Sequence, residues 1–262
     1  MSETGSWVEV PKPSWSSGAT KYQFPFDGDK LETPNAISIQ DSARFGITTY
    51  RIQPDTQAAL REHEDAFVIA RIDADRLGLV QYALKHGFIL CDTLTYWRGS
   101  VNIEHKPVAT GYWARPREAK DAEAIARLTA AAFSDYQGHY HADPRTRDKA
   151  VACYVEWAGN FDGPGLVIEH EKWEFPYLHR KVIAYGLFGL PCELTLAAVS
   201  GEHQGKGLYA DLVRACAAWG QENGAGEITI STQVTNLAVQ KVWARLGLTP
   251  YKHVYTLHRW PD

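Results

Sequence analysis

Short blocks of apolar residues run along most of the chain, and each block ends at a glycine, a proline or a polar turn. In the first part, runs rich in β-branched and aromatic residues predict three strands, at 45–52, 66–72 and 88–97. The apolar spacing of residues 77–86, with Gly87 after it, predicts a helix before the last of these strands. Together these elements predict a small α/β unit over residues 36–106.

A longer series of elements follows over residues 107–262. A short strand at 112–115 leads into a predicted helix, one face of which carries Ala122, Ile125, Leu128 and Ala132. Further helices are expected from Asp143–Pro144 to about Trp157, at 207–223 and at 236–246, and further strands at 164–170, 181–189, 192–199 and 226–232, with a strand pair at the end of the chain. Strand–turn–helix units after a run of strands predict the α/β class, with a mixed sheet covered by helices.

Residues 1–35 differ from the rest because prolines and glycines interrupt them, and we expect an irregular arm there. The two predicted units also share a short pattern. Gly87-Phe88 follows one predicted helix and Gly247-Leu248 follows another, and each pair leads into a strand. The first unit is either a half-copy of the second that lacks its glycine turn, or the matching positions arise by chance.

Composition narrows the classes of function. The 27 basic and 31 acidic side chains give a formal charge of −4, whereas a nucleic-acid interface needs a basic surplus on one face. The sequence shows no apolar stretch long enough to cross a bilayer and no signal peptide, so we expect a cytoplasmic protein with no membrane or nucleic-acid partner. The four cysteines have neither disulfide nor zinc spacing, and no metal site is predicted.

The most informative segment is the glycine-rich turn between Glu193 and Val213. A predicted strand leads into Gly201, Gly205 and Gly207, and an amphipathic helix begins directly after them. Such a turn lets backbone N–H groups converge on an anion, and the helix dipole favours a phosphate there. A tight structural turn with a helix cap is the alternative. The spacing fits neither the P-loop nor the G-x-G-x-x-G dinucleotide fingerprint.

Gln204-Gly205-Lys206-Gly207, directly after the predicted strand, resembles the Q/R-x-x-G-x-G/A coenzyme A signature of the GNAT acyltransferase superfamily. Downstream, Ser231-Thr232-Gln233-x-x-Asn236 and the helix after it resemble the second motif of that family. Upstream, Ala114-Arg115-Pro116 resembles the beginning of its first strand and helix. The resemblance covers residues 112–260 and implies a GNAT fold preceded by the small α/β unit.

The resemblance implies direct acyl transfer from acetyl-CoA, or another acyl-CoA, to an amine. The N–H groups that would hold the pantetheine arm and polarise the thioester carbonyl belong to Leu196, Ala197, Ala198 and Val199. The pyrophosphate would lie on the backbone of Gln204, Gly205, Lys206, Gly207 and Leu208. Asn236 and Trp243 would complete the cofactor site. Fixed dipoles at the carbonyl would stabilise the oxyanion that forms when the amine attacks.

A finer resemblance connects the whole chain to the amino-sugar acyltransferases related to TDP-fucosamine N-acetyltransferase. It is carried by Phe45-Gly46, Asp92-Thr93-Leu94, Thr232-Gln233 with Asn236, and residues 139–144 before Tyr154 and Trp157. It implies a nucleotide-linked amino sugar as acceptor and a role in polysaccharide biosynthesis, and it leaves a homodimer open. The anionic nucleotide would need local basic groups, such as Arg115, Arg145 and Arg180. The alternatives are a GNAT enzyme for another small amine, a peptide or an antibiotic, and a CoA-binding module without turnover.

The attacking amine must be neutral, so a general base or a chain of water molecules is expected. Residues 139–144 lie in the segment that borders the acceptor site in a GNAT fold. Histidine titrates near neutrality, so His141 is a candidate base, with Glu193 as the second. His139, Tyr140 and Asp143 are expected to contact the substrate. The alternatives are a helix N-cap for Asp143 and solvent-exposed positions for the histidines and Glu193.

One position departs from the family pattern. Many GNAT enzymes have a tyrosine seven residues after the asparagine, where its hydroxyl protonates the leaving thiolate, and this chain has Trp243 there. An indole N–H is not a usable acid at neutral pH. Either Tyr251 or Tyr255 supplies the proton, or the thiolate leaves without a dedicated acid. Trp243 as a core aromatic residue is the other interpretation, and Tyr209 is expected to contribute only its backbone amide.

Overall fold

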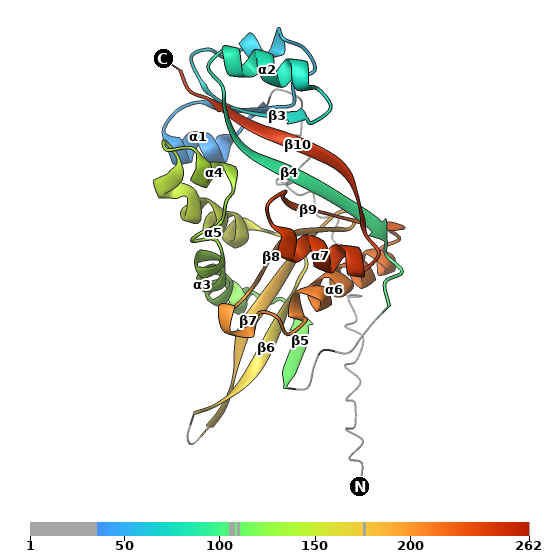
Figure 1. Cartoon of the computed structure of the whole chain (residues 1–262). Helices are drawn as coiled ribbons and strands as arrows, with labels where there is room; N and C mark the ends of the chain where they lie inside the picture. Colours follow the sequence, from blue (N-terminus) through green and yellow to red (C-terminus); the bar gives the residue numbers. More distant parts are fainter. Residues whose placement is uncertain (1–35, 105–107, 109–110, 175–176, 262) are drawn as a thin grey trace.

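The computed structural model describes residues 36–104, 108, 111–174 and 177–261. They form one ten-stranded sheet in the order β1-β2-β3-β10-β4-β9-β8-β7-β6-β5 (Figure 1). The strands are β1 (Ala36–Ile37), β2 (Thr49–Ile52), β3 (Phe67–Asp73), β4 (Ile89–Ser100), β5 (Tyr112–Pro116), β6 (Gly165–Glu174), β7 (Tyr177–Gly189), β8 (Glu193–Val199), β9 (Glu227–Gln233) and β10 (Thr249–Arg259). The helices are α1 (Ile39–Phe45), α2 (Leu77–Lys85), α3 (Ala122–Ala132), α4 (His139–Ala142), α5 (Ala150–Asn160), α6 (Leu208–Glu222) and α7 (Leu237–Arg245). The predicted α/β class with a mixed sheet is confirmed.

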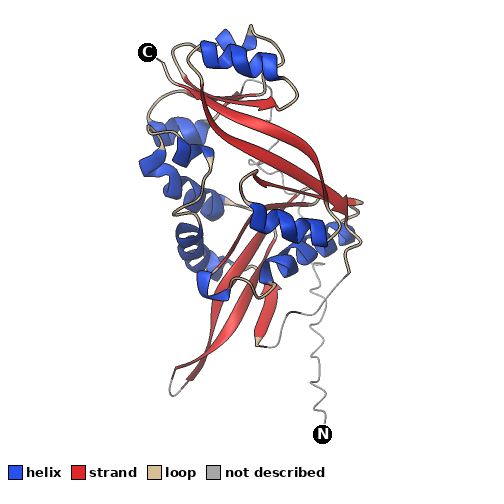
Figure 2. Ribbon diagram, in the orientation of Figure 1, coloured by secondary structure: helices blue, strands red, loops and turns tan. Residues whose placement is uncertain are grey.

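Helices lie on both sides of the sheet (Figure 2). Leu212 of α6 and Trp243 of α7 belong to one buried cluster with residues of β6–β9. Ile125 of α3 and Tyr154 of α5 belong to a second cluster around Tyr185 of β7. Burial of apolar surface between helices and sheet is the main favourable contribution to the stability of such a layered fold. None of the described helices is long and apolar enough to span a membrane.

The N-terminal unit and the C-terminal part exchange strands. β10, near the end of the chain, lies between β3 and β4, and β4 in turn lies between β10 and β9. Figure 1 shows β4 and β10 as two long strands side by side. The strand pair predicted at the end of the chain is wrong, because Thr249–Arg259 is one strand and β4 supplies its neighbour. The sheet is therefore continuous across the predicted boundary between residues 106 and 107.

The exchange follows a local two-fold pattern. β3, α2 and β4 match β9, α7 and β10 at a constant shift of 160 residues, so that Phe67 corresponds to Glu227. Gly87 and Gly247 follow the two matching helices with φ of 82° and 84°. β3 pairs with β10 in the same register in which β9 pairs with β4. This agreement in length, turn and register favours the half-copy over chance.

β8 and β9 are parallel neighbours that pair only at their beginnings, where Glu193 lies opposite Thr229. A β-bulge in β8 contributes to their divergence: Leu187 pairs with Leu196 and Phe188 with Leu194, which leaves Thr195 as the extra residue. Beyond Glu193, the edge of β8 toward β9 has no strand partner among the described residues. Its backbone N–H and C=O groups are therefore available to a ligand.

The N-terminal unit begins differently from the prediction. The strand predicted at 45–52 starts only at Thr49, because residues 39–45 form α1. The Ser38 side chain caps this helix, and Gly46 ends it with φ of 72°. The irregular arm predicted for residues 1–35 lies outside the described part of the chain.

The segment around Asp143 also differs from the prediction of a helix that begins there. α4 ends before Asp143, and α5 begins only at Ala150. The Asp143 side chain is fully buried and bonded to His258 and Trp260, which are distant in sequence. A carboxylate held in this way does not cap a long helix, and the chain turns around it.

Candidate active site

A cavity opens where β8 and β9 diverge. The N-terminal unit and α4–α5 complete its walls, so residues from most of the chain line one space. Its lining includes Glu193, Leu196, Ala197, Tyr209, Gln233 and Asn236 from the C-terminal part, Arg44, Arg51, Arg71 and Asp92 from the N-terminal unit, and Tyr136, His139, Tyr140 and Tyr154 from the segments around α4 and α5. The exchange of β4 and β10 brings the N-terminal unit next to the gap.

The glycine turn lies between β8 and α6. Gly205 and Gly207 have φ of 76° and 85°, and at both positions the space that a Cβ would occupy is open. α6 follows as a 15-residue helix, whose first N–H groups have no partner within the helix. Free N–H groups, open space and the positive end of the helix dipole together suit a phosphate group. The Gln204 side chain donates to the backbone oxygen of Val199 (3.4 Å) and connects the turn to β8.

The other residues predicted to bind the cofactor fall into two groups. Leu196, Ala197 and Asn236 line the cavity, and the Asn236 amide donates to Thr232 Oγ1 (3.0 Å). The side chains of Ala198, Val199 and Leu208 are buried, so these residues offer backbone groups to a ligand, and Lys206 is exposed on the turn. Contacts of all these residues with a cofactor stay a prediction.

Trp243 is fully buried, and its indole Nε1 donates to the hydroxyl of Tyr209 (3.1 Å). The structure therefore gives the Trp243 side chain a role in holding Tyr209 rather than in direct contact with a ligand. Tyr209 lines the cavity from α6, and burial raises its pKa above the usual value, so the hydroxyl is protonated at neutral pH. Neither Tyr251 nor Tyr255, the hydroxyls considered from the sequence, is among the residues that line the cavity.

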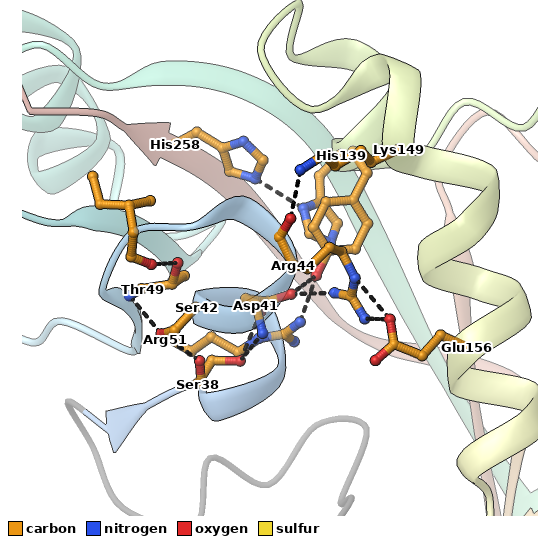
Figure 3. Close-up of polar contacts among 12 residues, drawn as sticks. Ser38, Asp41, Ser42, Arg44, Thr49, Arg51, His139, Lys149, Glu156 and His258 are labelled. Atoms are coloured by element: carbon orange, nitrogen blue, oxygen red, sulfur yellow. Dashed lines mark hydrogen bonds and ion pairs between the residues drawn. The ribbon is translucent and has the colours of Figure 1, made fainter.

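Three buried side chains form a hydrogen-bonded series beside the cavity, here called the His–His–Asp relay. His139 Nδ1 lies 2.8 Å from His258 Nε2, and His258 Nδ1 lies 2.8 Å from Asp143 Oδ2. Figure 3 shows His258, on β10, directed at His139. Trp260 Nε1 and the Arg145 backbone N–H also donate to the Asp143 carboxylate.

The charges in the relay follow from its surroundings. Burial opposes ionisation of Asp143, but hydrogen bonds from His258, Trp260 and the Arg145 backbone lower its pKa to about 2. Burial, His258 and nearby arginines hold the pKa of His139 well below 6.5. At neutral pH the relay therefore contains an ionised Asp143 and a neutral His139 that lines the cavity.

Asp41 joins the N-terminal unit to α4. The fully buried Asp41 carboxylate accepts hydrogen bonds from Arg51 Nε (2.7 Å), from the Tyr140 hydroxyl (2.7 Å) and from Arg44. Arg44 also bonds to Glu156 on α5 (2.8 Å; Figure 3). Burial opposes ionisation of Asp41, but Arg51, Tyr140 and Arg44 lower its pKa to about 2. The hydroxyl of Tyr140, predicted to contact substrate, is thus already engaged within the protein.

The two residues predicted as bases lie in different places. His141 is on α4 with its ring 6.1 Å from the ring of Tyr154, and it is not among the residues that line the cavity. Burial and Arg147 lower the pKa of His141 below 6.5. Glu193 lines the cavity at the point where β8 leaves β9. Both catalytic roles stay predictions, and His139, predicted only to contact substrate, is the histidine at the cavity.

Three buried side-chain oxygens in the cavity lining have no hydrogen-bond partner among the described residues: Asp92 Oδ1, Thr195 Oγ1 and Gln233 Oε1. Burial raises the pKa of Asp92, and its other oxygen accepts from Gln233 Nε2 (3.4 Å). A buried polar group without a partner costs about 1–3 kcal/mol. A ligand with several N–H and O–H groups would supply the missing partners.

The arginines predicted to meet an anionic nucleotide lie outside the cavity lining. Arg115 is bonded to Asp121 and Glu169, and Arg180 lies over the ring of Trp113. Arg145 lies over the ring of Trp260. The basic side chains in the lining are instead those of Arg44, Arg51 and Arg71.

One group of side chains has the composition of a metal site. Ligand atoms of Cys91, Asp143 and His258 lie within 4.8 Å of one another. However, His258 Nδ1 already bonds to Asp143, and burial together with Asp143 and Asp92 raises the pKa of Cys91 to about 12. A protonated thiol and a ring nitrogen that donates a hydrogen bond are poor metal ligands. Asp143 and His258 therefore fit the relay better than a metal centre.

Sequence reasoning did not assign chemical roles to Tyr209, His258 or Asp92. His258 lies 119 residues after His139 in the chain, and no local motif marks it. Tyr209 occupies a position next to the glycine turn where only a backbone amide is expected. Tyr209 and Trp243 each depart from the family pattern. These two departures were the one signal in the sequence that could have pointed to a role for the Tyr209 hydroxyl.

Comparison with known proteins agrees with this geometry. Residues 129–248 match the model of the Acetyltransferase (GNAT) family. The chain is 30% identical over 152 residues to the spore coat polysaccharide biosynthesis protein SpsD of Bacillus subtilis, and the match covers 56% of this chain and 50% of SpsD. This chain thus spans about half the length of that relative.

Two solved structures have the same fold. The GCN5-related N-acetyltransferase from Kribbella flavida is 15% identical with a TM-score of 0.51, and the match covers 81% of this chain and 80% of that one. The GCN5-related N-acetyltransferase from Sphaerobacter thermophilus is 12% identical with a TM-score of 0.51, covering 74% of this chain and 59% of that one. The family model thus matches residues 129–248, and the described part of the chain has the fold of these two N-acetyltransferase structures.

Proposed function

We propose that the protein transfers an acetyl or other short acyl group from acyl-CoA to the amino group of a nucleotide-linked amino sugar. The observation that carries the proposal is the set of unpaired oxygens of Asp92, Thr195 and Gln233 in the cavity lining. An amino sugar offers one amine and several hydroxyl groups in a small volume, and these match such a lining. The similarity to SpsD, named for spore coat polysaccharide biosynthesis, supports a sugar.

The donor would bind along β8 and the glycine turn. The N–H groups from Gly205 to Leu208 suit the pyrophosphate, and the unpaired edge of β8 suits the pantetheine arm. The bulge at Thr195 marks where this edge turns away from β9. Backbone N–H groups held there in fixed orientation would stabilise negative charge on the thioester oxygen during attack.

The Tyr209 hydroxyl is the proton donor that we propose for the departing thiolate. It lines the cavity, Trp243 Nε1 orients it, and it is protonated at neutral pH. In the proposed reaction, the amine nitrogen forms the C–N bond, the C–S bond breaks, and the sulfur takes the electron pair. Juxtaposition of amine and thioester in one cavity lowers the entropic part of the barrier.

A thiol-release assay with acetyl-CoA and a panel of acceptors tests the proposal. The panel contains nucleotide-linked amino sugars, the same sugars without nucleotide, polyamines, peptides and aminoglycosides. We expect turnover with nucleotide-linked amino sugars and less with the free sugars. Faster turnover of a peptide or an aminoglycoside would mean that the acceptor is of that class and not a nucleotide-linked amino sugar. CoA binding with no turnover of any acceptor would favour a binding module.

A further inference from the structure

We propose that His139 is the general base of the transfer and that His258 and Asp143 are positioning residues that hold it in the reactive tautomer. The inference rests on the proposed function for its chemistry. Its structural part, the tautomer of each ring, stands independently of any substrate.

The hydrogen-bond partners determine the tautomers. The ionised Asp143 accepts the proton on His258 Nδ1, so the other nitrogen of a neutral His258, Nε2, carries a lone pair. That lone pair accepts the proton on His139 Nδ1. The proton of a neutral His139 is thus committed to His258, and its Nε2 is left with a lone pair. Among the described residues, none is bonded to this Nε2.

Because His139 lines the cavity, the lone pair on its Nε2 can accept a proton from a bound substrate. His139 lies in the cavity lining with Asp92, Tyr136 and Gln233, next to the diverging strands along which the thioester would lie. Arg44, Arg51 and Arg71 also line the cavity. Arg44 and Arg51 are paired with the buried Asp41 carboxylate, which balances part of their charge.

The relay also explains how a buried imidazole can take up a proton. A proton on His139 Nε2 makes the ring cationic, and its Nδ1–H then donates more strongly to His258 Nε2. Asp143 supplies the negative charge at the far end of the relay, and three donors keep that carboxylate ionised. The arrangement is the one in which a carboxylate orients a histidine base, here with a second histidine between them.

The step balances as follows. The amine enters neutral, and its lone pair forms the bond to the thioester carbon. One N–H proton moves to His139 Nε2, and the C–S bond breaks with the electron pair on sulfur. The thiolate takes a proton from Tyr209, which regains one from water, while His139 returns its proton to water. The products are the amide and the free thiol of CoA.

The first test needs no substrate. Long-range ¹H–¹⁵N NMR spectra of the full chain, assigned with His139→Gln and His258→Gln, distinguish Nδ1–H from Nε2–H tautomers. We expect a proton on Nδ1 of both rings and none on His139 Nε2. Asp143→Asn should convert His258, and with it His139, to another tautomer. A His139 ring with a proton on Nε2 in the wild-type protein overturns the proposal, whatever the enzyme acylates.

The second test uses the thiol-release assay. His139→Ala should lower kcat by about 10²–10⁴-fold, the range for loss of a general base, with little change in KM for acetyl-CoA. Added imidazole should restore part of the rate in His139→Ala and none in Asp143→Asn. His253→Gln, which changes an exposed histidine on the same strand as His258, is the matched control and should keep its rate.

His141 and Glu193, the two bases predicted from the sequence, are tested in the same assay. If His141→Gln or Glu193→Gln lowers kcat by that factor while His139→Ala does not, the base is one of those residues and the proposal is wrong. Absence of turnover in the wild-type protein with every acceptor would contradict the proposed function, and the NMR tautomers would still decide the relay.

Discussion

Leu94 of β4 and Val254 of β10 lie directly opposite each other in the sheet, and they are also corresponding positions of the local repeat. The local two-fold relation therefore passes between these two side chains, which share a small buried cluster with Tyr96. Each half of the repeat completes the sheet of the other: β3 receives β10, and β9 receives β4. The N-terminal unit is thus part of the same ten-stranded sheet as the C-terminal part and not an appended module.

Because β10 pairs with β3 and β4, and β4 also pairs with β9, we expect that neither the N-terminal unit nor the C-terminal part folds alone. A fragment of residues 101–262 would leave one edge of β9 and both edges of β10 unpaired, and such edges favour aggregation. We expect this fragment to be insoluble or to lack a cooperative thermal transition, and co-expression with residues 1–104 to restore a soluble complex. A fragment 101–262 that melts cooperatively near the full-length temperature would contradict this.

Gly207→Glu should weaken CoA binding at least tenfold. The new side chain would need φ of 85° and would place a negative charge at the expected phosphate site. Gly224, at the other end of α6, has φ of 83°, so Gly224→Glu is a control with similar backbone strain. Isothermal titration calorimetry with CoA measures both variants. Equal loss of affinity in the two would mean that strain, and not the phosphate site, explains the effect.

Tyr209→Phe should lower kcat by about 10²-fold or more, since it removes the proposed acid, while CoA affinity changes little. Trp243→Phe keeps an aromatic core residue but removes the indole N–H on Tyr209, so we expect a smaller loss of kcat. Tyr255→Phe is the matched control. Steady-state kinetics with varied acetyl-CoA separates kcat from KM. A larger loss of kcat in Tyr255→Phe than in Tyr209→Phe would mean that Tyr255, and not Tyr209, is the acid.

Asp41→Asn should lower the free energy of unfolding by about 3–5 kcal/mol at pH 7, because it leaves Arg51 and Arg44 with a weakened buried partner. Glu156→Gln changes the half-exposed partner of Arg44 and should cost less than about 1 kcal/mol. Urea denaturation at pH 7 measures both. A similar loss of unfolding free energy in Asp41→Asn and Glu156→Gln would show that burial of Asp41 does not strengthen its ion pairs.

The same carboxylates predict the response to acid. Asp41 and Asp143 have pKa values of about 2 in the folded protein, below the ordinary value of 3.8. The folded state therefore binds fewer protons, and stability present above about pH 4 is lost as the pH falls toward 2. We expect the wild-type melting temperature to fall steeply across this interval, and Asp41→Asn to show a shallower fall. Parallel curves would argue against this contribution of Asp41.

The sequence predicted the elements that depend on neighbouring residues. β3, α2, β4, α6 and α7 lie within a few residues of their predicted bounds, because apolar periodicity and the glycines that end each block are local signals. The error around Asp143 occurred where distant contacts prevail. Asp143 was expected to contact the substrate, or else to cap a helix that begins there, but bonds to His258 and Trp260 hold its side chain in the interior.

By itself, then, the sequence determined the glycine turn and the helix after it, and with them the expected cofactor, because a phosphate site of this kind is built from consecutive backbone amides. The tertiary structure alone decided which side chains reach the cavity. His139, His258 and Asp143 come from two distant parts of the chain, and Tyr209 meets Trp243 across two helices. The contact of His139 with His258 depends on strand order and register, because His258 lies on β10, between β3 and β4.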